Sequence, residues 1–316
     1  MLNTRKAAII GCGFVGASIA FALMQQGIFS ELILIDQNEE KAQGEAMDLS
    51  HGIPYTTSMQ IRAGTYDDIT DCAMIILTAG VNQKPNESRL DLIGRNLVIL
   101  KSILSELTRR NVQGILLVVS NPVDVLTYAA WKLSHLPAHR VIGSGTVLDT
   151  ARLKYLLGQH LGVDSRNVHA AIIGEHGDSE LAVWSSANVS SVDLDHFCEL
   201  RGHHRHREAM EQILHDVRSS AYEIIQRKGA TYYGIAMAVA RIAQCVMMDE
   251  HAILPVSTVL QGEYGLSGLA LSIPSILGHA GVERVLDLPL SPKERQALLD
   301  CAQQLQSVIA QLPLLS

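Results

Sequence analysis

The chain has 316 residues, of which 47% are hydrophobic and only 18% are charged. This balance excludes a disordered chain, which needs few apolar residues and many charges. The formal net charge is −7 and aromatic residues make up 4%, which argues against nucleic-acid binding, because such proteins gather Lys and Arg into patches and stack bases on aromatic rings.

The length is about twice that of a common domain, so we expect two units. Five widely spaced cysteines form no Cys-x-x-Cys pair, which favours reduced thiols in a cytoplasm over disulfides or a zinc site. Arg5 and Lys6 precede an apolar stretch that reaches Cys12, but this stretch is shorter than the apolar core of a signal peptide. No apolar run approaches the ~18 residues of a membrane span. We therefore expect a cytoplasmic protein with no membrane segment.

Short apolar runs alternate with helical patterns in the first half of the chain. The predicted elements are a strand over Lys6–Gly11, a helix over Phe14–Gln26, a strand over Leu32–Asp36, a helix over Asn38–Ser50, a strand over Ala73–Thr78, a helix over Asp91–Arg109 and a strand over Ile115–Ser120. Such alternation predicts a parallel sheet with helices on both faces.

The pattern changes after about residue 145. The predicted elements are a helix over Val147–Gly158, a strand around Val168–Ile173, helices around Glu208–Arg227 and Thr231–Met248, β-rich runs over Ala252–Leu260 and Leu269–Ile273, and a last helix that opens at Ser291 with a capping box. We find no linker, repeat or low-complexity segment between the halves, so we expect two tightly packed units with a site between them.

A glycine motif, Gly11-x-Gly13-x-x-Gly16, follows the first predicted strand and opens the first helix. Glycines there permit a tight turn and close approach of the backbone to a pyrophosphate, and the helix N-terminus offers amide donors. Asp36 ends the second predicted strand, where a carboxylate accepts ribose hydroxyls and repels a 2′-phosphate. NAD, rather than NADP, is therefore the predicted cofactor. Its predicted contacts are Gly11, Gly13, Phe14, Val15, Gly16 and Asp36.

These features predict an α/β fold with two parts. The first is a doubly wound parallel-sheet dinucleotide-binding (Rossmann) domain over residues 1–145, and the second is a mixed α/β catalytic domain over residues 146–316.

Polar residues that are suited to catalysis or ligand binding follow the predicted strands or lie on a predicted helix. His176 lies directly after a strand, between Gly174 and Gly177, and Asp149 lies three positions before Arg152 on a predicted helix. That spacing puts both side chains on one helix face. Asn121 follows a further strand, at the edge where α/β sheets bind ligands. A structural histidine, helix caps and surface ion pairs are the alternatives when each residue is taken alone.

Taken together, these segments resemble the L-lactate and malate dehydrogenase family, and most closely the bacterial L-lactate dehydrogenases. The resemblance covers nearly the whole chain and includes residues 79–80, 87–90, 120–122, 143–145, 148–152, 174–178 and 228–234. It implies an NAD-dependent oxidoreductase that interconverts pyruvate and L-lactate, in glycolysis and fermentation.

The resemblance also implies roles for individual residues. His176 would donate a proton to the 2-oxo group as hydride arrives, and Asp149 would orient the imidazole. Arg152 would bind the substrate carboxylate through two parallel hydrogen bonds. Arg89 would polarise the carbonyl from a lid over residues 80–90. The remaining residues implied in the nicotinamide and substrate pocket are Asn121 and Thr231.

Substrate choice depends on Gln83, six residues before Arg89. Malate enzymes of the family carry Arg there, and neutral Gln83 would leave the second carboxylate of oxaloacetate without a counter-charge. Pyruvate is therefore favoured over oxaloacetate. The ammonium group of the neighbouring Lys84 would reverse this preference if it reached the substrate pocket. The alternatives are an L-2-hydroxyisocaproate-type enzyme, a malate dehydrogenase and a non-catalytic NAD-binding sensor.

Lys154 and His169 match the positions at which bacterial relatives bind fructose 1,6-bisphosphate across a subunit interface. Lys here replaces the usual Arg and cannot bind phosphate in bidentate fashion, so activation by this effector stays open. The resemblance implies a homo-oligomer, either a tetramer or a dimer that pairs when an effector binds. The segment from His203 to Arg207 lacks the Cys or carboxylate pattern of a metal site, and we expect no metal.

Overall fold

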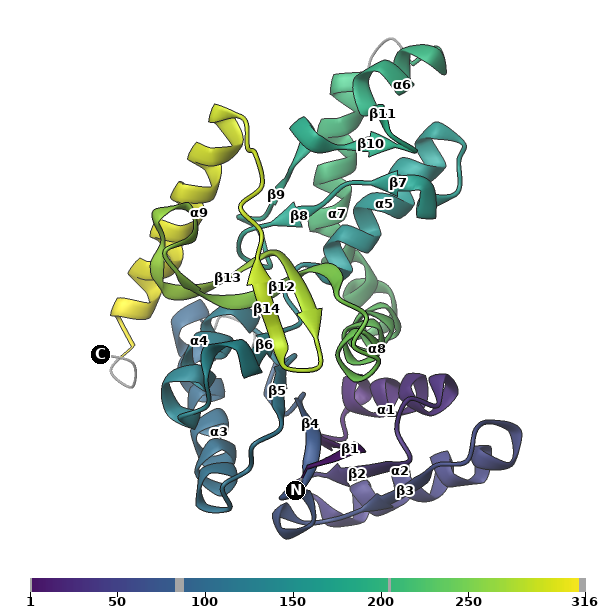
Figure 1. Cartoon of the computed structure of the whole chain (residues 1–316), viewed down its shortest axis with the longest axis vertical. Coiled ribbons are helices and arrows are strands. Elements are labelled where there is room, and N and C mark those ends of the chain that lie inside the picture. Colours follow the sequence, from purple (N-terminus) through teal and green to yellow (C-terminus); the bar gives the residue numbers. More distant parts are fainter. Residues whose placement is uncertain (1, 83–87, 204–205, 313–316) are drawn as a thin grey trace.

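The structure is a computed structural model that describes residues 2–82, 88–203 and 206–312, apart from the side chain of Arg89. One large sheet runs through the molecule, and helices flank both of its faces (Figure 1). The predicted α/β class, with a parallel dinucleotide-binding sheet and a second α/β part, is confirmed. Within the described ranges, none of the helices combines the length and the apolar character needed to span a bilayer.

The large sheet has nine strands. They are β1 (Asn3–Ile10), β2 (Glu31–Ile35), β3 (Gln60–Ala63), β4 (Cys72–Leu77), β5 (Ile115–Val118), β6 (Val141–Gly143), β12 (Ala252–Gln261), β13 (Ser267–Gly278) and β14 (Gly281–Val285). Their order is β14-β13-β12-β6-β5-β4-β1-β2-β3. Strands β1 to β6 pair in parallel, whereas β12 joins β6 in antiparallel fashion at Ser257 and Gly143. The sheet thus continues past residue 145 into the second half of the chain.

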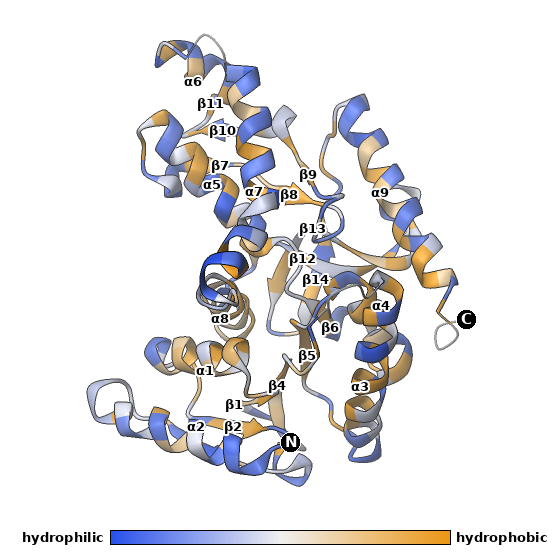
Figure 2. Ribbon diagram, turned by 180° about the vertical axis from the view of Figure 1, so that it is seen from behind, coloured by the Kyte–Doolittle hydropathy of each residue, from blue (hydrophilic) through white to orange (hydrophobic). Residues whose placement is uncertain are grey.

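Most of the helices cover the two faces of this sheet. The helices are α1 (Phe14–Gln26), α2 (Glu39–Gly52), α3 (Arg89–Arg109), α4 (Val123–Ser134), α5 (Val147–Leu161), α6 (Leu194–Leu200), α7 (His206–Lys228), α8 (Tyr233–Met247) and α9 (Pro292–Ala310). Of these, α6 and α7 pack elsewhere. In β1, Ala7 and Ile9 belong to the core cluster of α1, α2 and α8. Ala8 and Ile10 belong to the cluster of α3, α4 and α9. This alternation follows from the two-residue period of a strand and explains why the central strands are apolar on both faces. Figure 2 accordingly colours much of these strands as hydrophobic.

A third core cluster lies under α5, α6 and α7. Short strands there form two small sheets, with the orders β11-β10-β7 and β8-β9. These strands are β7 (Val168–His169), β8 (Ile172–Ile173), β9 (Leu181–Ala182), β10 (Asn188–Val189) and β11 (Val192–Asp193). The single strand predicted around residues 168–173 is therefore wrong, because β7 and β8 pair with different partners.

Several elements have no counterpart in the sequence prediction, namely β3, β6, β9, β10, β11, β14, α4 and α6. Helix α4 shows why, since nine of its residues are buried and a helix buried on most sides has no polar face to give it a period. By contrast, α1 begins and ends where predicted. The capping box predicted at Ser291 is present, with Glu294 as its second member.

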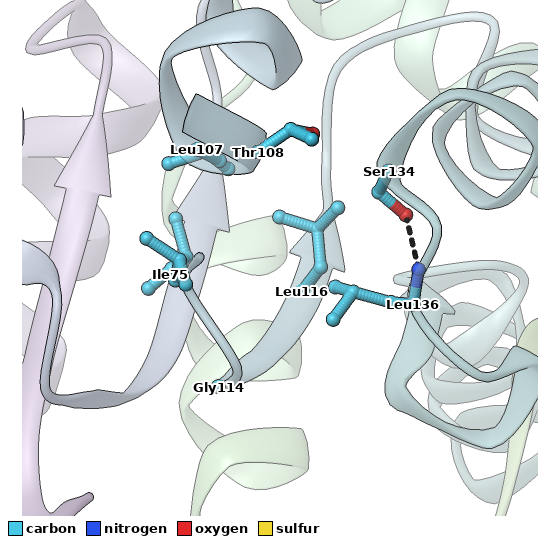
Figure 3. A pocket seen from close by; sticks show the side chains of 8 residues that line it. Ile75, Leu107, Thr108, Gly114, Leu116, Ser134 and Leu136 are labelled. Carbon is cyan, nitrogen blue, oxygen red and sulfur yellow. Dashed lines mark hydrogen bonds between the residues drawn. The ribbon is translucent and has the colours of Figure 1, made fainter. Parts of the chain in front are cut away.

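A small cavity lies between β4, β5, α3 and α4 (Figure 3). Its lining is apolar except for the hydroxyls of Thr108 and Ser134, and the Leu136 amide donates to Ser134 Oγ at 3.3 Å. No titratable side chain lines it, so it offers no group for catalysis.

Candidate active site

The glycine turn between β1 and α1 lets backbone segments, and a ligand at the start of α1, approach one another closely. Gly11 has φ of +107°, and a Cβ on Gly16 would lie 1.9 Å from the carbonyl oxygen of Gly11. Only glycine permits this contact. A Cβ on Gly13, in contrast, would meet nothing within 4 Å, and Gly13 caps an α1 whose first turn holds no acidic side chain. The open, positive N-terminus of α1 therefore fits the pyrophosphate of a dinucleotide.

Asp36 stands next to this turn, as predicted for a ribose acceptor. Its carboxylate accepts the Cys12 amide at 2.7 Å and the Asn38 amide at 3.0 Å. These bonds fix the carboxylate at the end of β2, and a carboxylate has lone pairs left for ribose hydroxyls. The turn and Asp36 together match the shape and charge of NAD.

Cys12 is buried inside the turn, with Sγ 3.6 Å from the Ile35 carbonyl oxygen. Burial, with a contribution from the Asp36 carboxylate, raises the pKa of the Cys12 thiol to about 12. Since the thiolate is the reactive form, burial disfavours reaction of this thiol, and its side chain fills the space inside the turn.

An aromatic contact connects the cofactor turn to the second half of the chain. The exposed ring of Phe14 stacks on Tyr232 with centroids 5.5 Å apart, and Tyr232 precedes the first residue of α8. Thr231, predicted to line the pocket, is the residue before Tyr232. The structure thus brings the start of α1, including the half-buried Val15, close to the segment that holds Thr231.

The predicted catalytic group is assembled on α5 and on the loop after β8. His176 Nδ1 lies 2.6 Å from Asp149 Oδ2, and Arg152 Nη1 lies 2.8 Å from Asp149 Oδ1. The Asp149 side chain is 2% exposed, whereas that of His176 is 25% exposed. The imidazole therefore has one nitrogen fixed by a buried carboxylate and one side open to a ligand, with a guanidinium beside it.

The charges of this group support one another. Burial alone would raise the pKa of Asp149, but His176 and Arg152 hold that pKa below its usual value. Burial alone would lower the pKa of His176, but the Asp149 carboxylate outweighs it and raises the pKa to about 9. His176 is therefore protonated at neutral pH in the ligand-free protein.

Asp124, at the start of α4, positions the His176 loop. It accepts the His176 amide at 2.7 Å, and its other oxygen accepts the hydroxyls of Ser257 at 2.6 Å and Ser272 at 3.3 Å. Burial raises the pKa of Asp124. The sequence shows Asp124 only as part of the segment that begins at Asn121, so this role was missed. The pairing also links that segment to the catalytic loop.

Asn96 of α3 joins two segments predicted to contact ligands. Its Oδ1 accepts the Val81 amide at 2.8 Å, and its Nδ2 donates to the Asn121 carbonyl oxygen at 2.8 Å. Asn96 is 3% exposed. It thus holds the start of the predicted lid against the exposed Asn121, and an isolated Asn inside a helical pattern gives no signal for this.

Glu180 is a buried carboxyl that the sequence did not single out. It is 1% exposed, and its Oε1 has no hydrogen-bond partner among the described residues. One of its oxygens lies within 4.8 Å of a ligand atom of both Asp149 and His176. Burial, followed by the Asp149 carboxylate, raises the pKa of Glu180 to about 8. The catalytic group therefore has a third titratable neighbour, faced by Arg152 and by Arg218 of α7.

The structure describes some of the other predicted residues fully and others only in part or not at all. Gln83 lies outside the described residues, and Arg89 begins α3 with a side chain that is not described. Lys154 is half-buried on α5 and His169 is exposed in β7. The segment around His203 leads into α7, which begins at His206.

Family models match both halves of the chain. The NAD binding domain of lactate/malate dehydrogenases matches residues 5–143, and the alpha/beta C-terminal domain of the same enzymes matches residues 146–313.

Full-length relatives agree with these models. An L-lactate dehydrogenase of a Thermoanaerobacter species is 48% identical over 97% of this chain and 99% of its own length. That of Priestia megaterium is 49% identical, over 94% and 93% of the two chains. The structure of the minor L-lactate dehydrogenase of Enterococcus mundtii superposes with a TM-score of 0.93 at 44% identity, and covers 97% of this chain and 98% of its own. Sequence, fold and site geometry agree that the chain belongs to the lactate/malate dehydrogenase family of NAD-dependent oxidoreductases.

Proposed function

We propose that this chain catalyses the reversible, NAD-dependent reduction of pyruvate to L-lactate. The observation that carries this proposal is the group of Asp149, His176 and Arg152, in which a proton donor and a carboxylate-binding guanidinium lie side by side. Relatives that cover nearly the whole chain are named L-lactate dehydrogenases. A sensor that only binds NAD has no use for this group.

His176 is the proton donor of the proposed reaction. Its Nδ1 is held by Asp149, so Nε2 is the nitrogen that gives a proton to the 2-oxo oxygen in reduction and takes it back in oxidation. Bound NADH supplies the hydride. Asp149 keeps the imidazole in one orientation and stabilises its charged form.

The remaining residues bind and orient the substrate. Arg152 pairs with the substrate carboxylate through its planar guanidinium, a geometry that Lys cannot reproduce. Arg89 polarises the carbonyl as negative charge develops on its oxygen. Asn121 and Thr231 line the pocket between the catalytic loop and the cofactor turn. Gln83 leaves a second carboxylate without a partner, and this selects pyruvate over oxaloacetate.

We also propose a homotetramer that responds to fructose 1,6-bisphosphate. Lys154 lies on α5, the helix that carries Asp149 and Arg152, and burial lowers the pKa of its ammonium. A phosphate beside Lys154 would offset that loss of hydration. His169 is exposed on β7, which packs against α5.

Oxidation of NADH by the purified protein tests the proposed function. We expect kcat/KM for pyruvate to exceed that for oxaloacetate and for 2-oxoisocaproate by at least ~10-fold, the ratio that corresponds to 1.4 kcal/mol. A preference for either competitor would change the substrate assignment. If none of the three reacts, with or without the sugar bisphosphate, an NAD-binding sensor becomes the better account.

Replacement of His176 by Ala should lower kcat at least ~10²-fold, because the general acid is lost. NADH affinity, measured by fluorescence titration, should be unchanged, since the cofactor turn is intact. His196→Ala, which removes an exposed histidine of α6, is the matched control. Near-normal turnover of the His176 variant would refute its role.

Replacement of Glu180 by Gln should move the alkaline limit of pyruvate reduction to lower pH. Reduction needs protonated His176, and an ionised Glu180 helps His176 keep its proton. Since the pKa of Glu180 is about 8, the carboxyl is neutral near pH 7, and the variant should keep its activity there. The pH profile of kcat/KM is the measurement, with Glu199→Gln on α6 as control. An alkaline limit that matches the wild type would show that Glu180 does not act on His176.

Replacement of Gln83 by Arg should raise the ratio of kcat/KM for oxaloacetate to that for pyruvate by at least ~10-fold, since a buried charge gains a partner. Steady-state kinetics with both acids measures the ratio. A ratio equal to that of the wild type would remove Gln83 from the specificity argument.

Millimolar fructose 1,6-bisphosphate should raise kcat/KM for pyruvate and drive assembly to the tetramer, measured by light scattering. Lys154→Ala should abolish both effects while it leaves activity without the effector intact. Unchanged activity and mass in the wild type would dispose of the effector proposal.

A further inference from the structure

Four side chains of types that can bind a metal ion meet at the surface. They are far in sequence from the proposed catalytic residues. Asp249 and His251 lie between the end of α8 and the start of β12, His279 lies in the turn between β13 and β14, and Glu283 lies in β14. Figure 1 shows these elements packed side by side. We call this set the α8–β14 cluster.

The ligating atoms of the α8–β14 cluster are close together. His251 Nδ1 lies 2.8 Å from Glu283 Oε2, and His251 Nε2 lies 3.7 Å from Asp249 Oδ2. His279 Nδ1 lies 3.1 Å from Asp249 Oδ1. In addition, one ligand atom each of Asp249, His279 and Glu283 lies within 4.8 Å of the other two. Every member therefore contacts at least one other.

Gly278 creates the space in which the two carboxylates converge. A Cβ on Gly278 would lie 2.1 Å from Glu283 Oε1 and 2.9 Å from Asp249 Oδ1. Two carboxylates that approach one another repel unless a cation lies between them. A protonated imidazole compensates the charge of one carboxylate, whereas one divalent cation compensates the charges of both Asp249 and Glu283.

We propose that the α8–β14 cluster binds a zinc ion through Asp249, His251, His279 and Glu283. Zinc takes imidazole nitrogen and carboxylate oxygen in tetrahedral sites. Bonds of about 2.1 Å in such a site place the ligand atoms about 3.4 Å apart. His279 Nδ1 and Asp249 Oδ1 are 3.1 Å apart, and both residues, with Glu283, have ligand atoms within 4.8 Å of one another. His251 offers one of its two nitrogens, of which Nδ1 lies 2.8 Å from Glu283 Oε2. Two imidazoles disfavour Ca²⁺ and Mg²⁺, which prefer oxygen ligands.

The catalytic group is a poorer zinc site, although Asp149, His176 and Glu180 also come within 4.8 Å of one another. There the Asp149 carboxylate is already paired with His176 at 2.6 Å and with Arg152 at 2.8 Å. The fixed charge of the guanidinium opposes a second cation. In the α8–β14 cluster, Asp249 Oδ1 accepts the His279 amide at 2.8 Å, but the ion pairs that Asp249 and Glu283 form among the described residues are with histidines. The cluster's side chains are between 30% and 76% exposed, so an ion can enter.

A zinc ion here would join the end of α8 to the turn between β13 and β14. Because the four ligands come together only in the folded chain, the ion binds the native state and stabilises it by mass action. It would leave the catalytic residues untouched.

Isothermal titration of ZnCl₂ into the tag-free, chelator-treated full-length protein tests the proposal. We expect one tight site per chain in the wild type and at least ~10-fold weaker binding in the double variant His251→Ala/His279→Ala. Glu283→Gln, which keeps side-chain size, should also weaken binding. His196→Ala removes an exposed histidine that pairs with Glu199 and should bind zinc as the wild type does.

Two further readouts distinguish zinc at the α8–β14 cluster from zinc at the catalytic group. One equivalent of zinc should raise the unfolding midpoint of the wild type but not that of the double variant, and it should leave the rate of NADH oxidation unchanged. Zinc binding of wild-type strength in both ligand variants would overturn the proposal. So would inhibition by one equivalent of zinc together with loss of binding in His176→Ala, because the ion would then lie at the catalytic group.

Discussion

The charge on the buried Asp149 carboxylate is the constraint that organises the site. A lone carboxylate with 2% exposure would pick up a proton rather than remain charged. Arg152, one helix turn away, and His176, from another element, each donate to one of its oxygens. The arrangement works in both directions, since the carboxylate that needs these cations also keeps the imidazole protonated. Removal of Asp149 would leave the Arg152 charge without this partner, and removal of either cation would leave the buried carboxylate with only one.

The sheet brings these groups to the cofactor turn. Parallel strands β1, β4 and β5 place their carboxyl ends at one edge, where the glycine turn and Asn121 lie. Strands β12 and β13 extend the same sheet from the second half of the chain and supply Ser257 and Ser272 to Asp124. The two halves therefore share a sheet, and both contribute residues to the proposed active site.

Local signals in the sequence were sufficient for much of this structure. The glycine turn, Asp36 and α1 follow from short-range patterns, because close packing and helix periodicity act over a few residues. Helix α4 was missed because nearly complete burial removes that periodicity. The expected strand at residues 168–173 failed for a related reason, since pairing partners rather than local composition divide it into β7 and β8.

The same limit applies to the site, where neighbours in sequence could be predicted and distant partners could not. Asp149 and Arg152 share a helix face and could be paired from spacing alone, whereas the role of His176 came from the family resemblance. Partners far apart in sequence could not be predicted, as for Asp124 and His176, which are separated by 52 positions. The zinc ligands proposed at the α8–β14 cluster, where the sequence indicated no metal, come from separate elements and show none of the close spacing by which metal motifs are found.

Asp124 connects the catalytic loop to the framework of the molecule. One carboxyl group accepts hydrogen bonds from the His176 backbone and from serines on two strands of the large sheet. The His176 backbone is therefore anchored to β12 and β13 through Asp124, and its position depends on the registration of these two strands. On heating, loss of turnover and loss of the sheet should then coincide as one cooperative event, so that activity reports the melting of the whole framework rather than the loosening of a surface loop.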